Sequence, residues 1–155
     1  MEIAIAETAQ EVEDVFSGLQ AFGEHLPEQN TRIPESIQEL VALYKGLDRL
    51  KIEHAKLGSM PSHVIRDVNL LLRSMRLTMK RVTRMFGKTR SIKLTGERPY
   101  AQVWFDLCNH FEEKEEGLLL WPRLELYSLF LKEILEYLRG FCLSRPYFWP
   151  LCANV

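Results

Sequence analysis

The chain has 155 residues, of which 46% are hydrophobic and 26% charged, and its net charge at pH 7 is −1. These values are typical of one globular domain and exclude a chain that is disordered over most of its length. The near-neutral charge gives no overall attraction for nucleic acid, and no stretch approaches the ~18 uncharged apolar residues of a membrane span.

Apolar residues recur at helical spacing in the first part of the chain and predict two amphipathic helices. The first covers roughly residues 3–24 and has an acidic polar face. The second begins near Pro34, which suits a first helical turn, and continues to about Leu57. Its short connection to the next helix, around Gly58, favours an antiparallel pair.

The longest predicted helix runs from Ser62 to Phe86 and has an apolar face beside a strongly basic one. The apolar face is formed by Val68, Leu72, Met75, Met79, Val82 and Phe86. The basic stripe is formed by Arg66, Arg73, Arg76, Lys80 and Arg84. Between Arg66 and Arg98, ten Lys and Arg residues stand against two acids, a local charge of +8 that leaves −9 for the rest of the chain. We therefore expect the other helices to pack around this one, partly as its electrostatic complement.

The segment after Phe86, GKTRSIKLTGERP, lacks apolar periodicity and predicts an exposed basic loop. A fourth helix is predicted to begin at Pro99 and to end around the acidic cluster of residues 112–116. Its buried face is formed by Val103, Trp104, Leu107 and Phe111.

A fifth helix is predicted from Pro122, in its first turn, to Gly140 as its C-cap. Its principal buried face is formed by Leu124, Tyr127, Leu131, Ile134, Leu135 and Leu138. Leu126, Phe130 and Tyr137 widen the apolar surface to about half the circumference, which predicts a helix buried between neighbours.

Five helices with short connections and no strand pattern predict an all-α protein, a single-domain helical bundle with antiparallel neighbours. The bundle is predicted to occupy residues 1–140, followed by an irregular Pro- and aromatic-rich C-terminal tail at 141–155. Tyr147, Phe148 and Trp149 make this tail too apolar to stay in water, so it either covers the end of the bundle or docks on a partner.

The sequence contains no pattern of an enzyme, a cofactor site or a metal site. Gly87, Lys88 and Thr89 resemble the end of a phosphate-binding loop, but the earlier glycine and the preceding strand are missing. Cys108 and His110 diverge on a helix and cannot act together as nucleophile and base. We therefore predict no catalytic residues, no cofactor, no metal and no small-molecule substrate.

Cysteine usage and the N-terminus predict a cytoplasmic protein. The three cysteines have no C-x-x-C spacing, which argues against both a disulfide framework and a zinc site and favours a reducing compartment. The N-terminus lacks the basic region and long apolar core of a secretory signal.

The basic helix has a structural interpretation and three functional ones. It either pairs internally with the acidic faces of the first and fourth helices, or it contacts an anionic membrane, a polynucleotide or a calmodulin-type partner. No aromatic residues interleave the basic ones, which argues against nucleic acid. The candidate residues for partner or anion contact are Arg66, Arg73, Arg76, Lys80, Arg84, Lys88, Arg90 and Lys93.

Residues 100–140 show a spacing that resembles a known family. The residues concerned are Trp104, Phe111, Glu115 and Glu116, then Arg123, Leu124, Tyr127, Leu131, Leu135, Leu138 and Gly140. Their spacing is similar to that of the fungal helical N-terminal domains found ahead of NACHT and other STAND nucleotide-switch modules or ankyrin repeats. The resemblance implies a signalling or interaction module and brings no catalytic residues. The first helix departs from the hydrophobic, Gly- and Ala-rich helix of membrane-active relatives, because residues 2–24 contain six acids.

We therefore predict a non-enzymatic helical-bundle module for protein interaction or signalling, adaptor or regulatory in role, that binds a protein partner or itself. The alternative is a peripheral membrane protein. It would place the basic amphipathic helix 62–86 and the basic loop 87–98 on anionic lipid, where each basic residue contributes about 1 kcal/mol.

Overall fold

The computed structural model describes residues 1–24, 32–57, 60–90, 102–107 and 120–144, and within these ranges the regular structure is helical throughout. The four long helices are α1 (Glu2–Gly23), α2 (Ile33–Leu57), α3 (Ser62–Arg90) and α5 (Leu120–Ser144). Residues 102–107 add a short helical segment. The predicted all-α helical bundle is therefore confirmed.

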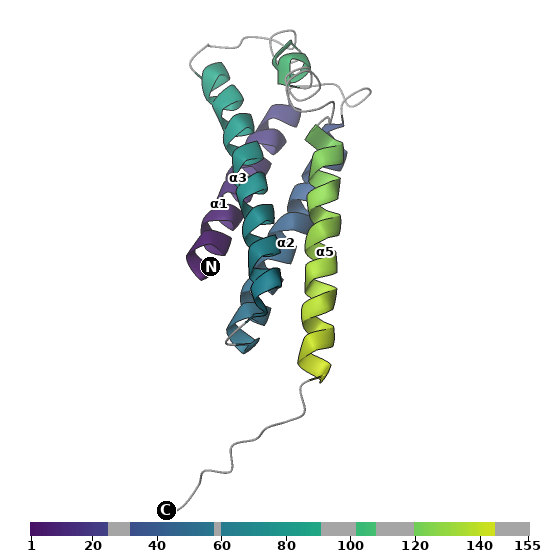
Figure 1. The fold of residues 1–155 in the computed structure, drawn as a ribbon. Helices are drawn as coiled ribbons and strands as arrows, with labels where there is room; N and C mark the ends of the chain where they lie inside the picture. The colour runs from purple at the N-terminus through teal and green to yellow at the C-terminus, as the bar shows by residue number, and fades with distance from the viewer. Residues whose placement is uncertain (25–31, 58–59, 91–101, 108–119, 145–155) are drawn as a thin grey trace, which may run out of the picture.

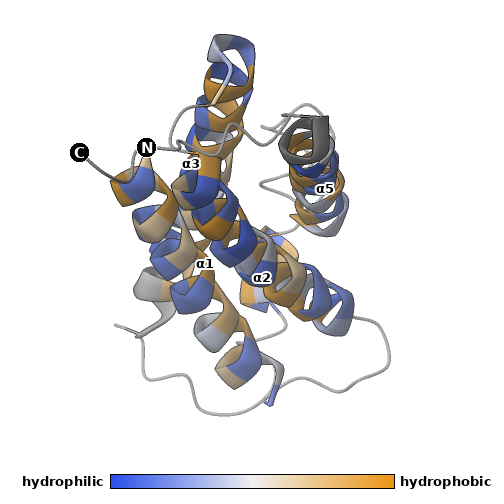
Figure 2. Ribbon diagram, turned by 90° about the horizontal axis from the view of Figure 1, so that it is seen from below, coloured by the Kyte–Doolittle hydropathy of each residue, from blue (hydrophilic) through white to orange (hydrophobic). Residues whose placement is uncertain are grey.

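The four long helices alternate in direction along the chain, as Figure 1 shows. The closest backbone contacts join α1 to α2, α2 to α5, α5 to α3 and α3 to α1, which closes a ring. As a result α2 and α3, which follow one another in sequence, are antiparallel but lie at opposite corners of the bundle. Figure 2 looks along the bundle and shows hydrophobic and hydrophilic residues on each of the four helices.

The core contains side chains from all four helices. The predicted apolar face of the central helix is fully buried, at Val68, Leu72, Met75, Met79, Val82 and Phe86. Val12 and Leu19 of α1 and Leu43 and Leu47 of α2 meet this face from the other side of the core. Burial of this continuous apolar stripe is the main favourable term that holds α3 in place.

An aromatic cluster closes one end of the core. The Phe22 ring lies 5.4 Å from the Phe86 ring and 6.5 Å from the Trp104 ring, measured between centroids. Trp104 and Leu107 are buried and Val103 is half-buried, as predicted for the fourth helix. Phe111, the acidic cluster 112–116 and the tail residues Tyr147, Phe148 and Trp149 lie outside the described residues.

Two helix ends differ from the prediction. Helix α3 continues beyond Phe86 to Arg90, so residues 87–90, which were expected in the loop, are helical. Helix α5 passes through Gly140 and ends at Ser144, so the predicted glycine C-cap is wrong. Glycine inside a helix costs about 1 kcal/mol relative to alanine, which the hydrogen bonds of a further turn offset.

The expectation that α5 is buried between neighbours is also wrong. Leu126, Phe130 and Tyr137 have exposed fractions of 45%, 61% and 47%. Helix α5 packs closely on α2 but only sparsely on α3, and none of the described elements covers its remaining side. The width of an apolar face measures how much surface a helix offers for burial, and here the fold leaves part of that surface in water.

Candidate functional site

The basic stripe of α3 divides into a structural part and an exposed part. Arg76 Nη1 lies 2.8 Å from Glu7 Oε2, and Arg76 Nε donates to Glu11 Oε1 at 3.3 Å. Lys80 Nζ approaches the same Glu11 oxygen at 3.8 Å. Arg76 therefore links α3 to the acidic face of α1, as the structural interpretation of the stripe expects.

The other described arginines of the stripe point into solvent. Arg73 and Arg84 are exposed and make no ion pair or hydrogen bond with the described residues. Among these residues, Arg66 has only its sequence neighbour Asp67 as a partner, at 3.5 Å from Nε to Oδ1. The side chains of Lys88 and Arg90 and the whole of Lys93 lie outside the described part of the chain, so their predicted role stays a prediction.

Two leucines lie among these cations on the solvent side of α3. Leu70 is 64% exposed and Leu77 is 51% exposed. With the neighbouring cations they form a line at helical spacing that we name the outer stripe: Arg66, Leu70, Arg73, Leu77, Lys80 and Arg84. The outer stripe therefore combines four basic side chains with two exposed apolar ones.

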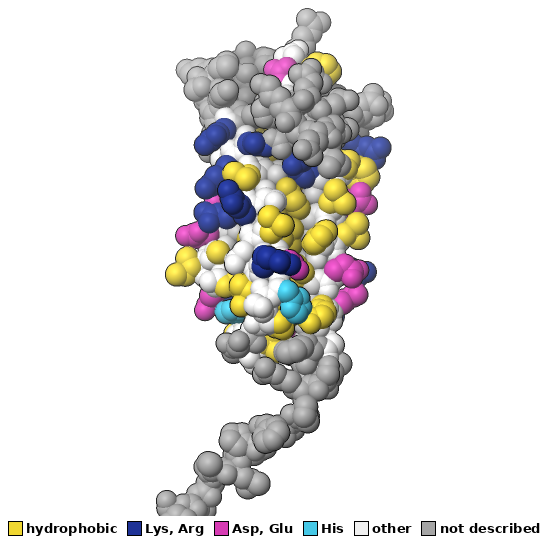
Figure 3. Space-filling model, viewed as in Figure 1, with side chains coloured by type: hydrophobic (Ala, Val, Ile, Leu, Met, Phe, Trp, Pro, Cys, Tyr) yellow, Lys and Arg dark blue, Asp and Glu magenta, His cyan; other side chains and the backbone are white. Residues whose placement is uncertain are grey.

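An apolar groove lies beside the outer stripe, between α3 and α5. It has a volume of about 470 Å³ and is lined by Asp67, Leu70, Leu71 and Ser74 of α3 and by Leu126, Tyr127 and Phe130 of α5. We name it the α3/α5 groove. Figure 3 shows this face, with hydrophobic side chains gathered between the two helices and basic side chains over the upper part of α3.

Polar and aromatic contacts fix the spacing of the two helices along the groove. The Tyr127 hydroxyl donates to the Ser74 carbonyl at 3.2 Å and lies 2.9 Å from the Thr78 hydroxyl. Towards the other end, the His63 and Tyr137 rings meet edge to face with centroids 5.7 Å apart. These contacts anchor α5 against α3 while the apolar rims between them stay open.

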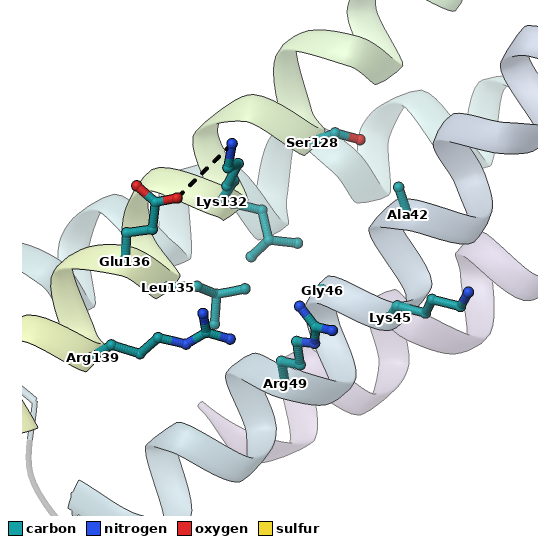
Figure 4. Close-up of a pocket in the computed structure, with 10 residues that line it drawn as sticks. Ala42, Lys45, Gly46, Arg49, Ser128, Lys132, Leu135, Glu136 and Arg139 are labelled. Carbon is teal, nitrogen blue, oxygen red and sulfur yellow. Dashed lines mark ion pairs between the residues drawn. The ribbon is translucent and has the colours of Figure 1, made fainter.

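A second hollow, of about 350 Å³, lies between α2 and α5. Lys45 and Arg49 of α2 and Lys132 and Arg139 of α5 surround it. Figure 4 shows Arg49 and Arg139 extending into the same gap from the two helices. We name this hollow the α2/α5 pocket.

Sequence reasoning found the cations of α3 but missed the residues of both hollows. The groove residues Leu126 and Phe130 were assigned to the core, because apolar spacing does not say which side of a helix is covered. Arg49 and Arg139 lie 90 positions apart, and nothing in their local sequence pairs them. A sequence signal would require knowing beforehand that α2 and α5 are neighbours.

The described residues contain no group of three His, Cys, Asp or Glu side chains placed to hold a metal ion. None of the described helices combines the length and the hydropathy needed to cross a bilayer.

In comparisons with known proteins, no family model, no curated protein and no solved structure matches this chain.

Proposed function

We propose that this protein is a non-enzymatic interaction module of the cytoplasm, adaptor or regulatory in role, that binds an amphipathic helix of a partner protein in the α3/α5 groove. The partner helix has acidic residues along one edge. The observation that carries the proposal is an open apolar groove beside the outer stripe, in which Arg73 and Arg84 have no ion-pair or hydrogen-bond partner among the described residues. The resemblance of residues 100–140 to fungal STAND N-terminal domains, which are interaction modules, supports the same class of function.

The residues on the α3 and α5 sides of the groove indicate which side chains the partner helix would have. Apolar anchors at positions i, i+4 and i+7 would fill the space between Leu70, Leu126 and Phe130. Acidic residues on one edge would meet Arg73 and the other cations of the outer stripe. Two acids lie at the groove, Asp67 in its lining on α3 and the exposed Glu133 on α5. An acidic edge is therefore favoured only where it faces Arg73 and points away from these two carboxylates.

Selection from a displayed library of amphipathic helices tests this proposal with defined probes. We expect selection on the wild-type protein to enrich helices with an acidic edge over helices with a basic edge. Binding of the enriched peptides should weaken at high salt and fall at least tenfold in the Arg73→Glu variant. The Phe130→Ser variant should lose binding as well, whereas Lys51→Glu on the exposed face of α2 should not.

Three results would contradict the proposal. Enrichment of helices without regard to charge would remove the role of the outer stripe. Binding to the Arg73→Glu and Phe130→Ser variants that is as tight as binding to the wild type would place the peptide elsewhere. A stable dimer in light scattering, abolished by the same two substitutions, would mean that a second copy of the chain occupies the groove instead of a partner protein.

Peripheral binding to anionic lipid is the second candidate function, because Leu70 and Leu77 are exposed among the cations of the outer stripe. On a membrane these leucines would enter the interface while the cations meet lipid headgroups. Vesicles of phosphatidylcholine with and without phosphatidylserine distinguish this function from partner binding. Sedimentation with the acidic vesicles only, lost in 0.5 M salt and in the Leu77→Asp variant, would favour the membrane, and no sedimentation would exclude it.

A further inference from the structure

The α2/α5 pocket lies on the opposite side of α5 from the α3/α5 groove and is independent of the function proposed there. Four basic side chains surround it, and its one acid, Glu136, lies 3.9 Å from Lys132. The lining therefore has a net charge of +3. Such an excess of one sign around a hollow attracts an ion of the opposite sign.

Of the four basic residues, Arg49 and Arg139 are placed best to bind an anion between them. Both side chains are exposed, and neither makes an ion pair or hydrogen bond within the part of the chain that the structure describes. They extend into one gap from two different helices, as Figure 4 shows, although two guanidinium groups repel each other. A doubly charged oxyanion between them would remove that repulsion and accept hydrogen bonds from both planar groups.

The wall of the pocket is apolar and closely built. Leu131 and Leu135 of α5 line it opposite Gly46 of α2. At Gly46 a Cβ atom would lie 2.5 Å from Leu131 Cδ2, so the two helices approach there as closely as a glycine allows. The ligand therefore has an apolar body next to its anionic group.

Ser128 supplies an independent observation at the far end of the pocket. Its Oγ is buried and has no hydrogen-bond partner. The buried hydroxyls of Thr8 and Ser36 behave differently, because each donates at 2.7 Å to the backbone carbonyl four residues earlier in the chain. A buried hydroxyl without a partner loses about 1–3 kcal/mol. Rotation of the Ser128 side chain about χ1 would turn Oγ into the pocket, where a ligand oxygen would restore the hydrogen bond.

We propose that the α2/α5 pocket binds a phosphate monoester with an elongated organic body. Arg49 and Arg139 hold the phosphate, Leu131 and Leu135 contact the body, and Ser128 donates a hydrogen bond to a polar atom at its far end. Ser128 and Arg139 are eleven residues apart on α5, about 16 Å of helix, and the long arginine side chain shortens the span that the ligand covers.

Calorimetric titration of the full chain with hexyl phosphate tests the phosphate end of the pocket. We expect hexyl phosphate to bind more tightly than inorganic phosphate, and hexanol not to bind. Arg49→Gln and Arg139→Gln should each reduce the affinity at least tenfold, with the lysine variants in between. Lys51→Gln, which removes one exposed positive charge of α2 outside the pocket, is the control and should bind as wild type does.

Two further experiments identify the source of the phosphate and test the role of Ser128. Vesicles with phosphatidic acid present the same monoester on a membrane, so sedimentation with them, lost in Arg49→Gln, would identify a lipid headgroup as the source. Binding of hexyl phosphate without vesicle binding would identify a soluble ligand. 6-Hydroxyhexyl phosphate should bind more tightly than hexyl phosphate, and the Ser128→Ala variant should remove that difference.

Two outcomes overturn the proposal. One is the absence of binding to both hexyl phosphate and phosphatidic acid vesicles. The other is binding that persists unchanged in Arg49→Gln and Arg139→Gln, which would place the anion elsewhere on the protein surface. Circular dichroism of the variants provides the folding control, and both arginines are exposed enough that we expect native spectra.

Discussion

Tyr127 links α3 and α5 through a short chain of hydrogen bonds. Its hydroxyl donates to the Ser74 carbonyl, and the buried Thr78 hydroxyl donates to Tyr127 in turn. Because α3 and α5 share few other close contacts, this link determines how the two helices are spaced next to the α3/α5 groove.

We expect Tyr127→Phe to lower the free energy of unfolding by about 1 kcal/mol, because it leaves the buried Thr78 hydroxyl without its partner. Urea unfolding measures this change. Thr78→Val removes the second hydroxyl, so the double variant should lose less than the sum of the two single losses. Strictly additive losses would show that the two hydroxyls are not coupled.

Arg76 and Arg84 lie on the same helix and differ in their partners. Arg76 bridges Glu7 and Glu11 of α1, whereas Arg84 has no partner. We expect Arg76→Gln to lower the free energy of unfolding by about 1 kcal/mol, since it removes both contacts at once. Arg84→Gln should change it by less than about 0.5 kcal/mol.

Salt provides the control for the Arg76 comparison. In 1 M NaCl the screening length falls to about 3 Å, so the difference between the Arg76→Gln and Arg84→Gln variants should shrink. Urea unfolding at low and high salt measures it. Equal stability of the two variants at low salt would mean that the Arg76 network is as weak as an ordinary surface ion pair.

At the scale of the helices, two glycines test how closely α2 and α5 pack. Gly46 has a close approach to the buried Leu131, whereas Gly140, on the exposed side of α5, has nothing within 4 Å of an added Cβ. Both residues are inside helices, so alanine would favour the helix by up to about 1 kcal/mol at either position. The two positions therefore separate helix propensity from packing.

We expect Gly46→Ala to destabilise the bundle by about 1 kcal/mol net, because overpacking of 1–3 kcal/mol exceeds the gain in propensity. Gly140→Ala should stabilise it by about 0.5 kcal/mol. Thermal unfolding of both variants gives the comparison. Equal stabilisation by the two substitutions would show that α2 and α5 are further apart at Gly46 than the structure has them.

The sequence predicts where each helix lies in the chain better than it predicts which helices pack against one another. The period of Met75, Met79 and Val82 determines which face of α3 is buried, because that information is local. The position of α2 and α3 at opposite corners depends on packing across the whole molecule. For the same reason the cations of the outer stripe could be found from α3 alone, whereas Arg49 and Arg139 could not be paired.

At the scale of the whole molecule, we expect Leu71 to stabilise the fold and Leu70 to serve the proposed function. They are adjacent in α3, but Leu71 is 6% exposed and Leu70 is 64% exposed. If the α3/α5 groove is open in the free protein, only the buried leucine supports the fold. The exposed leucine then remains available for a partner.

We expect Leu71→Ala to lower the free energy of unfolding by about 2–4 kcal/mol, through lost apolar burial and the cavity that remains. Leu70→Ala should change it by less than about 0.5 kcal/mol, because the side chain gains little from folding and alanine suits a helix. Urea unfolding at several protein concentrations measures both and separates the free chain from any assembly. A loss at Leu70 comparable to that at Leu71, independent of concentration, would show that another part of the same chain covers the groove, and the partner helix would then have to displace it.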